Sequence, residues 1–166
     1  MNKHLILLIP LLIIIGYFSY STLVVNTGEQ LQLQIVQPID PVDKFRGNYV
    51  DMRYDASQIA IDLFSYEPNP GETVYLTFHD TVLDKVKTVS RTKPESKLCM
   101  RGEIRWVSDE TVFVRYNIDS YFVEEESALF IEKSMGTSNL TMAVRVDTFC
   151  NPTIEHLYIN GSIFQG

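Results

Sequence analysis

Histidine, cysteine and tryptophan are scarce in this sequence, which holds three His, two Cys and one Trp among 166 residues. Three histidines leave few candidates for a general base or a metal ligand. None of the three, which are His4, His79 and His156, lies in a recognisable catalytic or metal-binding motif. His79 and His156 each have an acidic neighbour, but adjacent residues of a strand point to opposite faces, so neither pair makes a dyad. We therefore expect no metal site, no cofactor and no catalytic residue.

Basic residues are also in the minority. The chain has 14 Lys and Arg against 21 Asp and Glu, which gives a net charge of −7. Only Lys3 precedes the hydrophobic N-terminal run, so the rest of the chain carries a net charge of −8. An acidic domain repels a phosphate backbone, which excludes nucleic acid as an expected partner.

Charge is absent altogether from residues 5–25, where the sequence is LILLIPLLIIIGYFSYSTLVV. As a helix, this segment would be about 30 Å long, which matches the hydrocarbon core of a bilayer. We predict a transmembrane anchor within residues 1–27, with the lipid bilayer as its partner. Lys3 on its N-terminal side places the N-terminus in the cytoplasm and the rest of the chain outside. The alternative is a signal peptide cleaved after Ser21, which would export the domain equally well.

Beyond the anchor, the hydrophobic pattern has a period of two, which is typical of half-buried strands. Only residues 124–135, EEESALFIEKSM, have a helical pattern, with acidic residues in the first turn. Residues 28–166 are thus predicted to form one mainly β domain, an antiparallel barrel or sandwich of roughly eight short strands with one short helix. The predicted strands are Gln30–Gln37, Tyr49–Tyr54, Gln58–Phe64, Thr73–Phe78, Leu98–Val107, Thr111–Ile118, Leu140–Val146 and Glu155–Ile163.

The segment over residues 40–54, DPVDKFRGNYVDMRY, is denser in turn-forming and charged residues than the rest of the domain. Gly47 and Asn48 accept a positive φ angle, so we expect a bend before the next strand. Along that strand, Val50 and Met52 share the face expected in the core. The opposite face is either a binding surface or a solvated one. The candidate binding residues at the bend and on that face are Arg46, Asn48, Tyr49, Asp51 and Arg53.

This segment resembles the signature of the GDYXXLXY family, a group of bacterial membrane-anchored proteins of unknown function. In that family a DPxDxFRGDYVxLxY stretch follows one N-terminal helix. Gly47, Tyr49 and Tyr54 match it, whereas Asn48 stands in place of Asp and Met52 in place of Leu. The resemblance implies an N-terminal anchor, a β-rich extracytoplasmic domain and no established activity.

Two later stretches resemble the same family in the expected order. The first is residues 116–126, YNIDSYFVEEE, although Glu124 and Glu126 stand where Pro and Gly are usual. The second is residues 144–161, which is similar to the family's last pair of strands. Members of the family often occur alongside a multi-pass membrane protein of unknown function. The resemblance therefore implies a partner in the plane of the membrane.

The two cysteines, Cys99 and Cys150, leave two possibilities open. An exported domain is in an oxidising setting, where an even number of cysteines favours a disulfide bond. A loop of this length would stabilise the fold by about 4 kcal/mol in the chain-entropy model. The alternative is a pair of buried, unbonded thiols.

These observations favour a non-enzymatic accessory or binding module that presents a β domain near the bilayer, acting with a membrane partner. The alternative is an envelope hydrolase, since residues 46–50 also resemble a strand motif of membrane-anchored signal peptidases. Those enzymes carry a Ser-Met nucleophile directly after the membrane helix and a lysine base on a later strand. Here Ser134 and Met135 form the only such pair, next to Lys133 and in the wrong chain order.

Overall fold

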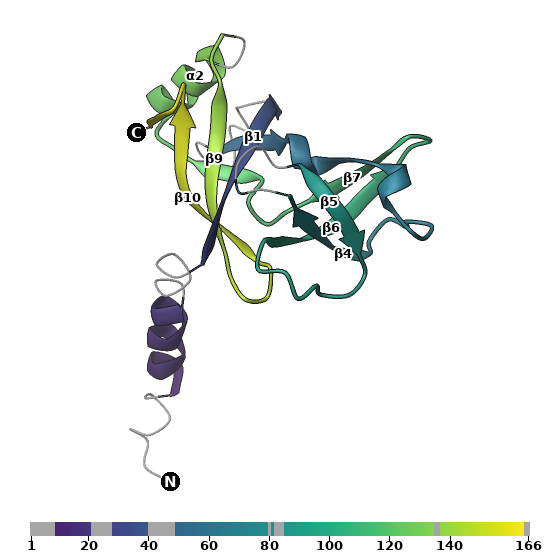
Figure 1. Cartoon of the computed structure of the whole chain (residues 1–166). Helices are drawn as coiled ribbons and strands as arrows, with labels where there is room; N and C mark the ends of the chain where they lie inside the picture. Colours follow the sequence, from purple (N-terminus) through teal and green to yellow (C-terminus); the bar gives the residue numbers. More distant parts are fainter. Residues whose placement is uncertain are drawn as a thin grey trace.

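Strands make up most of the computed structural model, which describes residues 9–20, 28–39, 49–79, 81, 85–134 and 137–164 (Figure 1). Eleven strands in this part of the chain form two sheets in which every neighbouring pair is antiparallel. The prediction of a mainly β, antiparallel fold with a short helix is confirmed, and the strands form two curled sheets.

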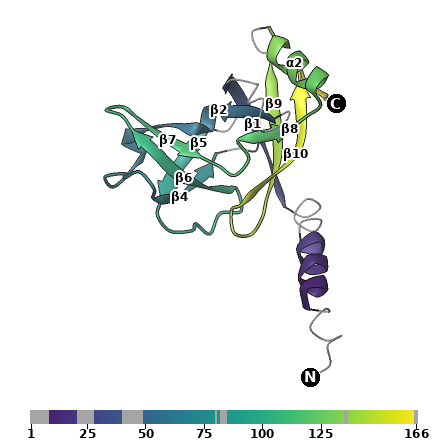
Figure 2. The same cartoon turned by 180° about the vertical axis from the view of Figure 1, so that it is seen from behind.

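The first sheet has six strands in the order β11-β10-β9-β1-β2-β8. They are β1 (Glu29–Ile39), β2 (Tyr49–Tyr54), β8 (Ser120–Phe122), β9 (Leu140–Val146), β10 (Pro152–Ile159) and β11 (Ser162–Ile163). Helix α2 (Glu125–Ser134) lies at one end of this sheet, close to β9 and β10 (Figures 1 and 2).

The second sheet has five strands in the order β3-β7-β6-β4-β5. They are β3 (Gln58–Ala60), β4 (Thr73–Phe78), β5 (Val86–Ser90), β6 (Cys99–Val107) and β7 (Thr111–Arg115). Two single turns of 3-10 helix flank β3, namely η1 (Asp55–Ser57) and η2 (Ile61–Leu63). Because η1 directly follows β2, it carries the chain from the first sheet to the second.

The alternating apolar residues of the strands form one buried core. Leu31 and Leu33 of β1 are buried while the glutamines between them are half-buried, as their period of two predicts. On β2, Val50, Met52 and Tyr54 all point into the core. The side of the strand that carries Asp51 is therefore free to face outward.

Two buried tyrosine hydroxyls tie the sheets together. Tyr54 donates a hydrogen bond to the carbonyl of Ile118 (2.7 Å), and Tyr116 donates one to the carbonyl of Ala56 (2.5 Å). Burial raises the pKa of Tyr54 far above its usual value, so this hydroxyl remains a donor at any physiological pH. Gly102 of β6 leaves room for the Tyr116 ring, because a Cβ there would lie 2.9 Å from it. Tyr54 thus joins β2 to the turn before β8, and Tyr116 joins the end of β7 to η1.

The strand count of roughly eight is wrong, for reasons that lie in short or weakly patterned segments. The predicted strand Gln58–Phe64 breaks after β3, because Ile61–Leu63 turns into 3-10 helix. The predicted strand Glu155–Ile163 is a hairpin whose turn residues, Asn160 and Gly161, have φ angles of 51° and 80°. Two strands are not among the predicted ones: β5, in which only Val89 is buried, and β8, which has three residues.

A separate helix over residues 9–20 projects away from the sheets at the end where β1 begins (Figures 1 and 2). The parts of the predicted anchor at 5–8 and 21–25 lie outside the described residues. Within the described ranges, no helix has both the length and the apolar character needed to cross a membrane.

Candidate binding site between the two sheets

A β-bulge in β6 exposes the only tryptophan of the chain. Strands β6 and β7 pair Ile104 with Val114 and then Trp106 with Phe113, so Arg105 is an extra residue on β6. Inward and outward residues alternate up to Ile104, and regular alternation would have put Trp106 in the core. The bulge instead leaves both Arg105 and Trp106 on the outer surface, with Trp106 47% exposed.

Trp106 is held in place by an aromatic neighbour. Its ring stacks on that of Phe113, with 4.3 Å between centroids and an interplanar angle of 23°. Stacking with a partner fixes the orientation of the indole ring while about half of the residue's surface remains open to solvent. The pair is a rigid aromatic platform at the margin of the second sheet.

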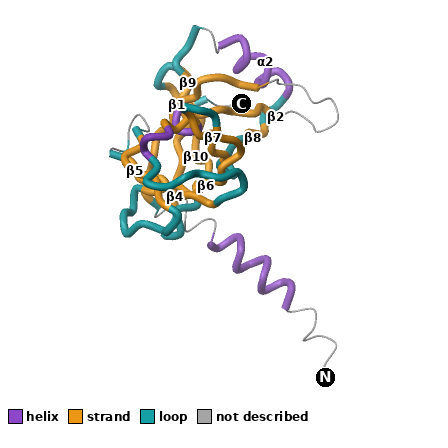
Figure 3. Tube along the Cα trace, turned by 90° about the vertical axis from the view of Figure 1, so that its right-hand side faces the viewer, coloured by secondary structure: helices purple, strands orange, loops and turns teal. Residues whose placement is uncertain are grey.

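A cavity of about 360 Å³ lies beside this platform, where β2 of the first sheet approaches β6 and β7 of the second. Figure 3, a view from the side, shows the strands of both sheets between α2 and the helix over residues 9–20, which lie at opposite ends. The cavity combines the outward faces of β2, β6 and β7 with the turn before β8. Its charged and hydrogen-bonding residues include Asp51, Arg53, Arg105, Arg115, Asp119 and Ser120.

The charges in this cavity are not balanced. Arg115 pairs with Asp119 through Nε and Oδ2, which are 3.2 Å apart, and the Ser120 hydroxyl donates to Asp51 at 2.8 Å. Arg53 forms no ion pair or hydrogen bond with another side chain in the described part of the chain. The contact of Arg105 within the described residues is at 3.5 Å to Glu103, a residue outside the cavity. Among the described lining residues, the three arginines therefore exceed the two carboxylates.

Asp119 occupies an unfavourable position for a charged group. Burial raises the pKa of Asp119 to about 6, against the opposing effects of the Tyr116 N–H and the Arg115 guanidinium. The nearby Asp51 carboxylate raises the pKa further. Asp119 is therefore mostly ionised at neutral pH and mostly protonated at pH 5, which would release Arg115 from its ion pair.

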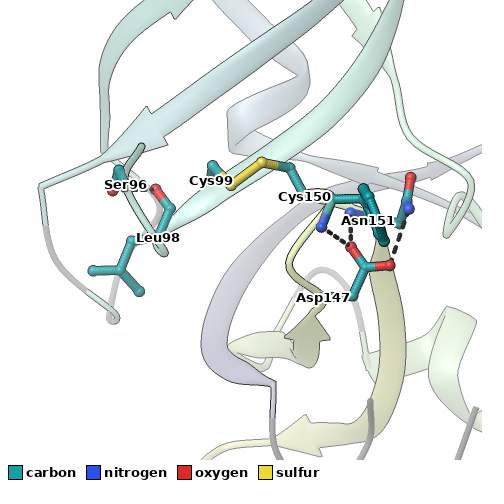
Figure 4. Close-up of a disulfide and its surroundings, with 7 residues drawn as sticks. Ser96, Leu98, Cys99, Asp147, Cys150 and Asn151 are labelled. Atoms are coloured by element: carbon teal, nitrogen blue, oxygen red, sulfur yellow. Dashed lines mark hydrogen bonds between the residues drawn. A yellow bond between two sulfur atoms is a disulfide. The ribbon is translucent and has the colours of Figure 1, made fainter. Parts of the chain in front are cut away.

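A second and larger cavity, of about 490 Å³, lies at the end of the domain next to the helix over residues 9–20. A disulfide bond between Cys99 and Cys150 closes this end by joining β6 to the turn after β9 (Figure 4). Beside it, Asp147 accepts hydrogen bonds from the backbone N–H groups of Phe149 and Asn151, from the Asn151 amide and from the Tyr20 hydroxyl.

At this disulfide end, both carboxylate oxygens of Asp147 already accept hydrogen bonds from other residues of the protein. Burial raises the pKa of Asp147, but the four hydrogen bonds outweigh burial and hold the pKa below its usual value. The carboxylate thus organises the turn around Cys150, whose own φ angle is 66°. Despite its larger volume, we interpret this cavity as a structural junction, and the cavity between the sheets as the candidate binding site.

The residues proposed from the sequence fall into three groups. Asp51 and Arg53 both line the cavity between the sheets. Tyr49 belongs to β2 and pairs with Phe122, but its side chain is not among those described. Arg46 and Asn48 lie outside the described residues.

Sequence reasoning missed the partners that make this surface a site. They come from three other segments and include Arg105, Trp106, Arg115 and Asp119. No sequence feature pointed to them, because Arg105 and Trp106 continue the alternation of charged and uncharged residues that begins at Met100. The bulge that redirects Trp106 is visible only in the pairing of β6 with β7.

The serine required by the hydrolase hypothesis lies in α2 and is not arranged as a nucleophile. Ser134 is buried, and its hydroxyl donates a hydrogen bond to the carbonyl of Phe130 at 2.8 Å. Met135 and the side chain of Lys133 are outside what the structure describes. Among the described residues, no three His, Cys, Asp or Glu side chains are grouped so as to hold a metal ion.

The fold and the cavity define a mainly β protein of two antiparallel sheets, with an arginine-rich cleft and an aromatic margin where the sheets meet. The chain belongs to the GDYXXLXY protein family, whose model matches residues 10–157. The resemblance noted in the sequence is therefore confirmed. A search of curated proteins and a search of solved structures each gave no match.

Proposed function

We propose that this protein is a membrane-anchored, extracytoplasmic binding module without enzymatic activity, and that the cavity between the sheets is its binding site. The observation that carries the proposal is the convergence of Arg53, Arg105 and Trp106 on one cavity from two different sheets. Exposed aromatic and arginine side chains are the groups that dominate binding energies at protein surfaces. A side chain exposed by a bulge contributes less to folding than it would in the core, which favours a role in binding.

The membrane part of the proposal is supported by the uncharged segment 5–25, with Lys3 before it and an acidic domain after it. The described helix over residues 9–20 lies within that segment. In this arrangement the N-terminus is cytoplasmic and residues 28–166 stand outside. A multi-pass membrane protein is a suitable partner, because the anchor would hold the domain close to the bilayer.

Site-specific photo-crosslinking in native membranes tests the proposal. A benzophenone amino acid in place of Gln58, an exposed residue that lines the cavity, should give an adduct with a specific envelope component. The matched control replaces Lys87, which is exposed on β5 at the far edge of the second sheet. Adding Arg53→Ala to the Gln58 probe should remove the adduct, because it removes a cation of the cavity.

Three outcomes would contradict the proposal. Identical adducts from Gln58 and Lys87 would mean that the cavity makes no specific contact. Extraction of the full chain from membranes by alkaline carbonate would show that it is not integrally anchored. Protection of the domain from protease added to spheroplasts would locate it on the cytoplasmic side.

A further inference from the structure

The described residues that line the cavity between the sheets carry an excess of positive charge, although the protein as a whole is acidic. The chain carries a net charge of −7, yet the described residues that line this cavity include three arginines and two carboxylates. Arg53 has no acidic partner within the described residues, and the guanidinium of Arg105 is only loosely held by Glu103. A guanidinium fork matches a carboxylate bidentately, so an acidic ligand would supply the missing counter-charge.

The aromatic platform of Trp106 and Phe113 adds a second requirement that a ligand of this cavity must meet. About half of the surface of Trp106 is open, and stacking on Phe113 prevents the indole from turning into the core. The face of an aromatic ring is electron-rich, so it attracts the weakly positive C–H face of a saturated ring. Ser57, Gln58 and Ser120 line the same cavity and can exchange hydrogen bonds with hydroxyl groups.

The walls of the cavity disfavour an extended peptide. Strands β2, β6 and β7 each have a hydrogen-bonded neighbour on both sides. None of the three therefore offers an unpaired edge to which a peptide could add as another strand. The volume of about 360 Å³ is in the range of small-ligand pockets.

We infer that the cavity binds a carboxylate-bearing saccharide, with the sugar ring over Trp106 and its carboxylate between Arg53 and Arg105. The inference rests on the proposed function and names the ligand class for the same site. The hydroxyl groups of the sugar meet Ser57, Gln58 and Ser120. Asp51 and Asp119 limit the affinity, since both carry charge of the same sign as the ligand.

The chain offers a direct reporter, because Trp106 is its only tryptophan. The full chain in detergent micelles is titrated with methyl glucuronide and with methyl glucoside, which differ only in the carboxylate. N-acetylmuramic acid and N-acetylglucosamine form a second acidic and neutral pair. We expect a saturable change in tryptophan fluorescence with at least one acidic sugar and binding of its neutral counterpart about tenfold weaker or more.

Variants assign the effect to the cavity. Arg53→Ala should weaken binding of the acidic sugar about tenfold or more, while Arg53→Lys, which keeps the charge and loses the fork, should be intermediate. Lys87→Ala removes a cation from the far edge of the second sheet and should leave binding unchanged. Unchanged circular dichroism and thermal midpoints exclude misfolding as the cause.

The failure of this inference is distinguishable from failure of the proposed function. Equal binding of the acidic and neutral sugars, or no binding of either acid, overturns the saccharide assignment. Saturable binding of an acetylated, amidated Asp-Glu dipeptide in the absence of sugar binding also overturns it and identifies a peptide ligand. In each case a specific crosslink from Gln58 would leave the proposed function standing.

Discussion

The cavity between the sheets and the disulfide end each contain an aspartate, and the pKa values of the two aspartates are shifted in opposite directions. Asp147, at the disulfide end, is surrounded by four hydrogen-bond donors, and its pKa is lowered. Asp119, at the cavity, has a pKa raised to about 6 because burial outweighs its donors. The charged form of Asp147 therefore stabilises the fold, whereas the charged form of Asp119 destabilises it.

This difference separates a region built for stability from one built for contact. At the disulfide end the polar groups of the turn satisfy one another, and a covalent bond secures it. At the cavity, the exposed Trp106 and Arg53, which has no side-chain partner among the described residues, lie beside Asp119, whose pKa burial raises to about 6. Uncompensated groups of this kind are typical of sites whose partner comes from outside the chain.

Removal of the disulfide bond should have the largest effect. Cys99 and Cys150 are 51 residues apart, and in the chain-entropy model a crosslink over such a loop is worth about 4 kcal/mol. We expect the double variant Cys99→Ser, Cys150→Ser to unfold at correspondingly lower urea in detergent micelles, followed by circular dichroism. The unmodified protein treated with reductant is the control. Equal stability with and without reductant would mean that the bond contributes nothing.

The substitution Asp147→Ala should be the next most harmful. It leaves the backbone donors of the turn without their acceptor in a partly buried position, which costs about 2 to 3 kcal/mol. Asp109→Ala, in an exposed turn, is the matched control and should change stability by less than about 0.5 kcal/mol. The comparison between the two regions would fail if both variants had the same midpoint of urea unfolding.

Asp119→Asn should instead stabilise the protein at neutral pH. The folded-state pKa of Asp119 is above its unfolded value, so its favourable contribution is complete below about pH 4 and is lost as pH rises through about 6. The variant should therefore gain about 2 kcal/mol relative to the unmodified protein between pH 4 and pH 7. Urea unfolding at several pH values measures this difference, and a constant difference across the range would contradict it.

The strands with strong alternation could be predicted from sequence, whereas those shaped by their surroundings could not. Strands β2, β4 and β9 have the predicted ends, and α2 lies within the segment 124–135 whose pattern indicated a short helix. The pattern of Val86–Ser90 is weak because an edge strand buries little, and pairing with β4 determines its structure.

The candidate site was only half predictable, for a similar reason. Alternation along Tyr49–Tyr54 put Asp51 and Arg53 on an outward face, and they do line the cavity. The facing residues belong to strands of the other sheet, and a single sequence does not say which outer faces adjoin. The exposure of Trp106 depends on a bulge in the pairing of β6 with β7, which only the structure reveals.

The smallest predicted effect compares two arginines of the first sheet. Arg145 contacts both carboxylate oxygens of Glu155, at 3.1 and 3.2 Å, and donates to the carbonyl of Gly28, so Arg145→Ala should cost about 1 to 2 kcal/mol. Arg53 has no such partner among the described residues, and Arg53→Ala should change stability by less than about 0.5 kcal/mol. Urea unfolding curves of the two variants, recorded under the same conditions, measure this difference in stability. If Arg53→Ala lost as much stability as Arg145→Ala, Arg53 would be a residue that supports the fold and not one that is available to bind a ligand.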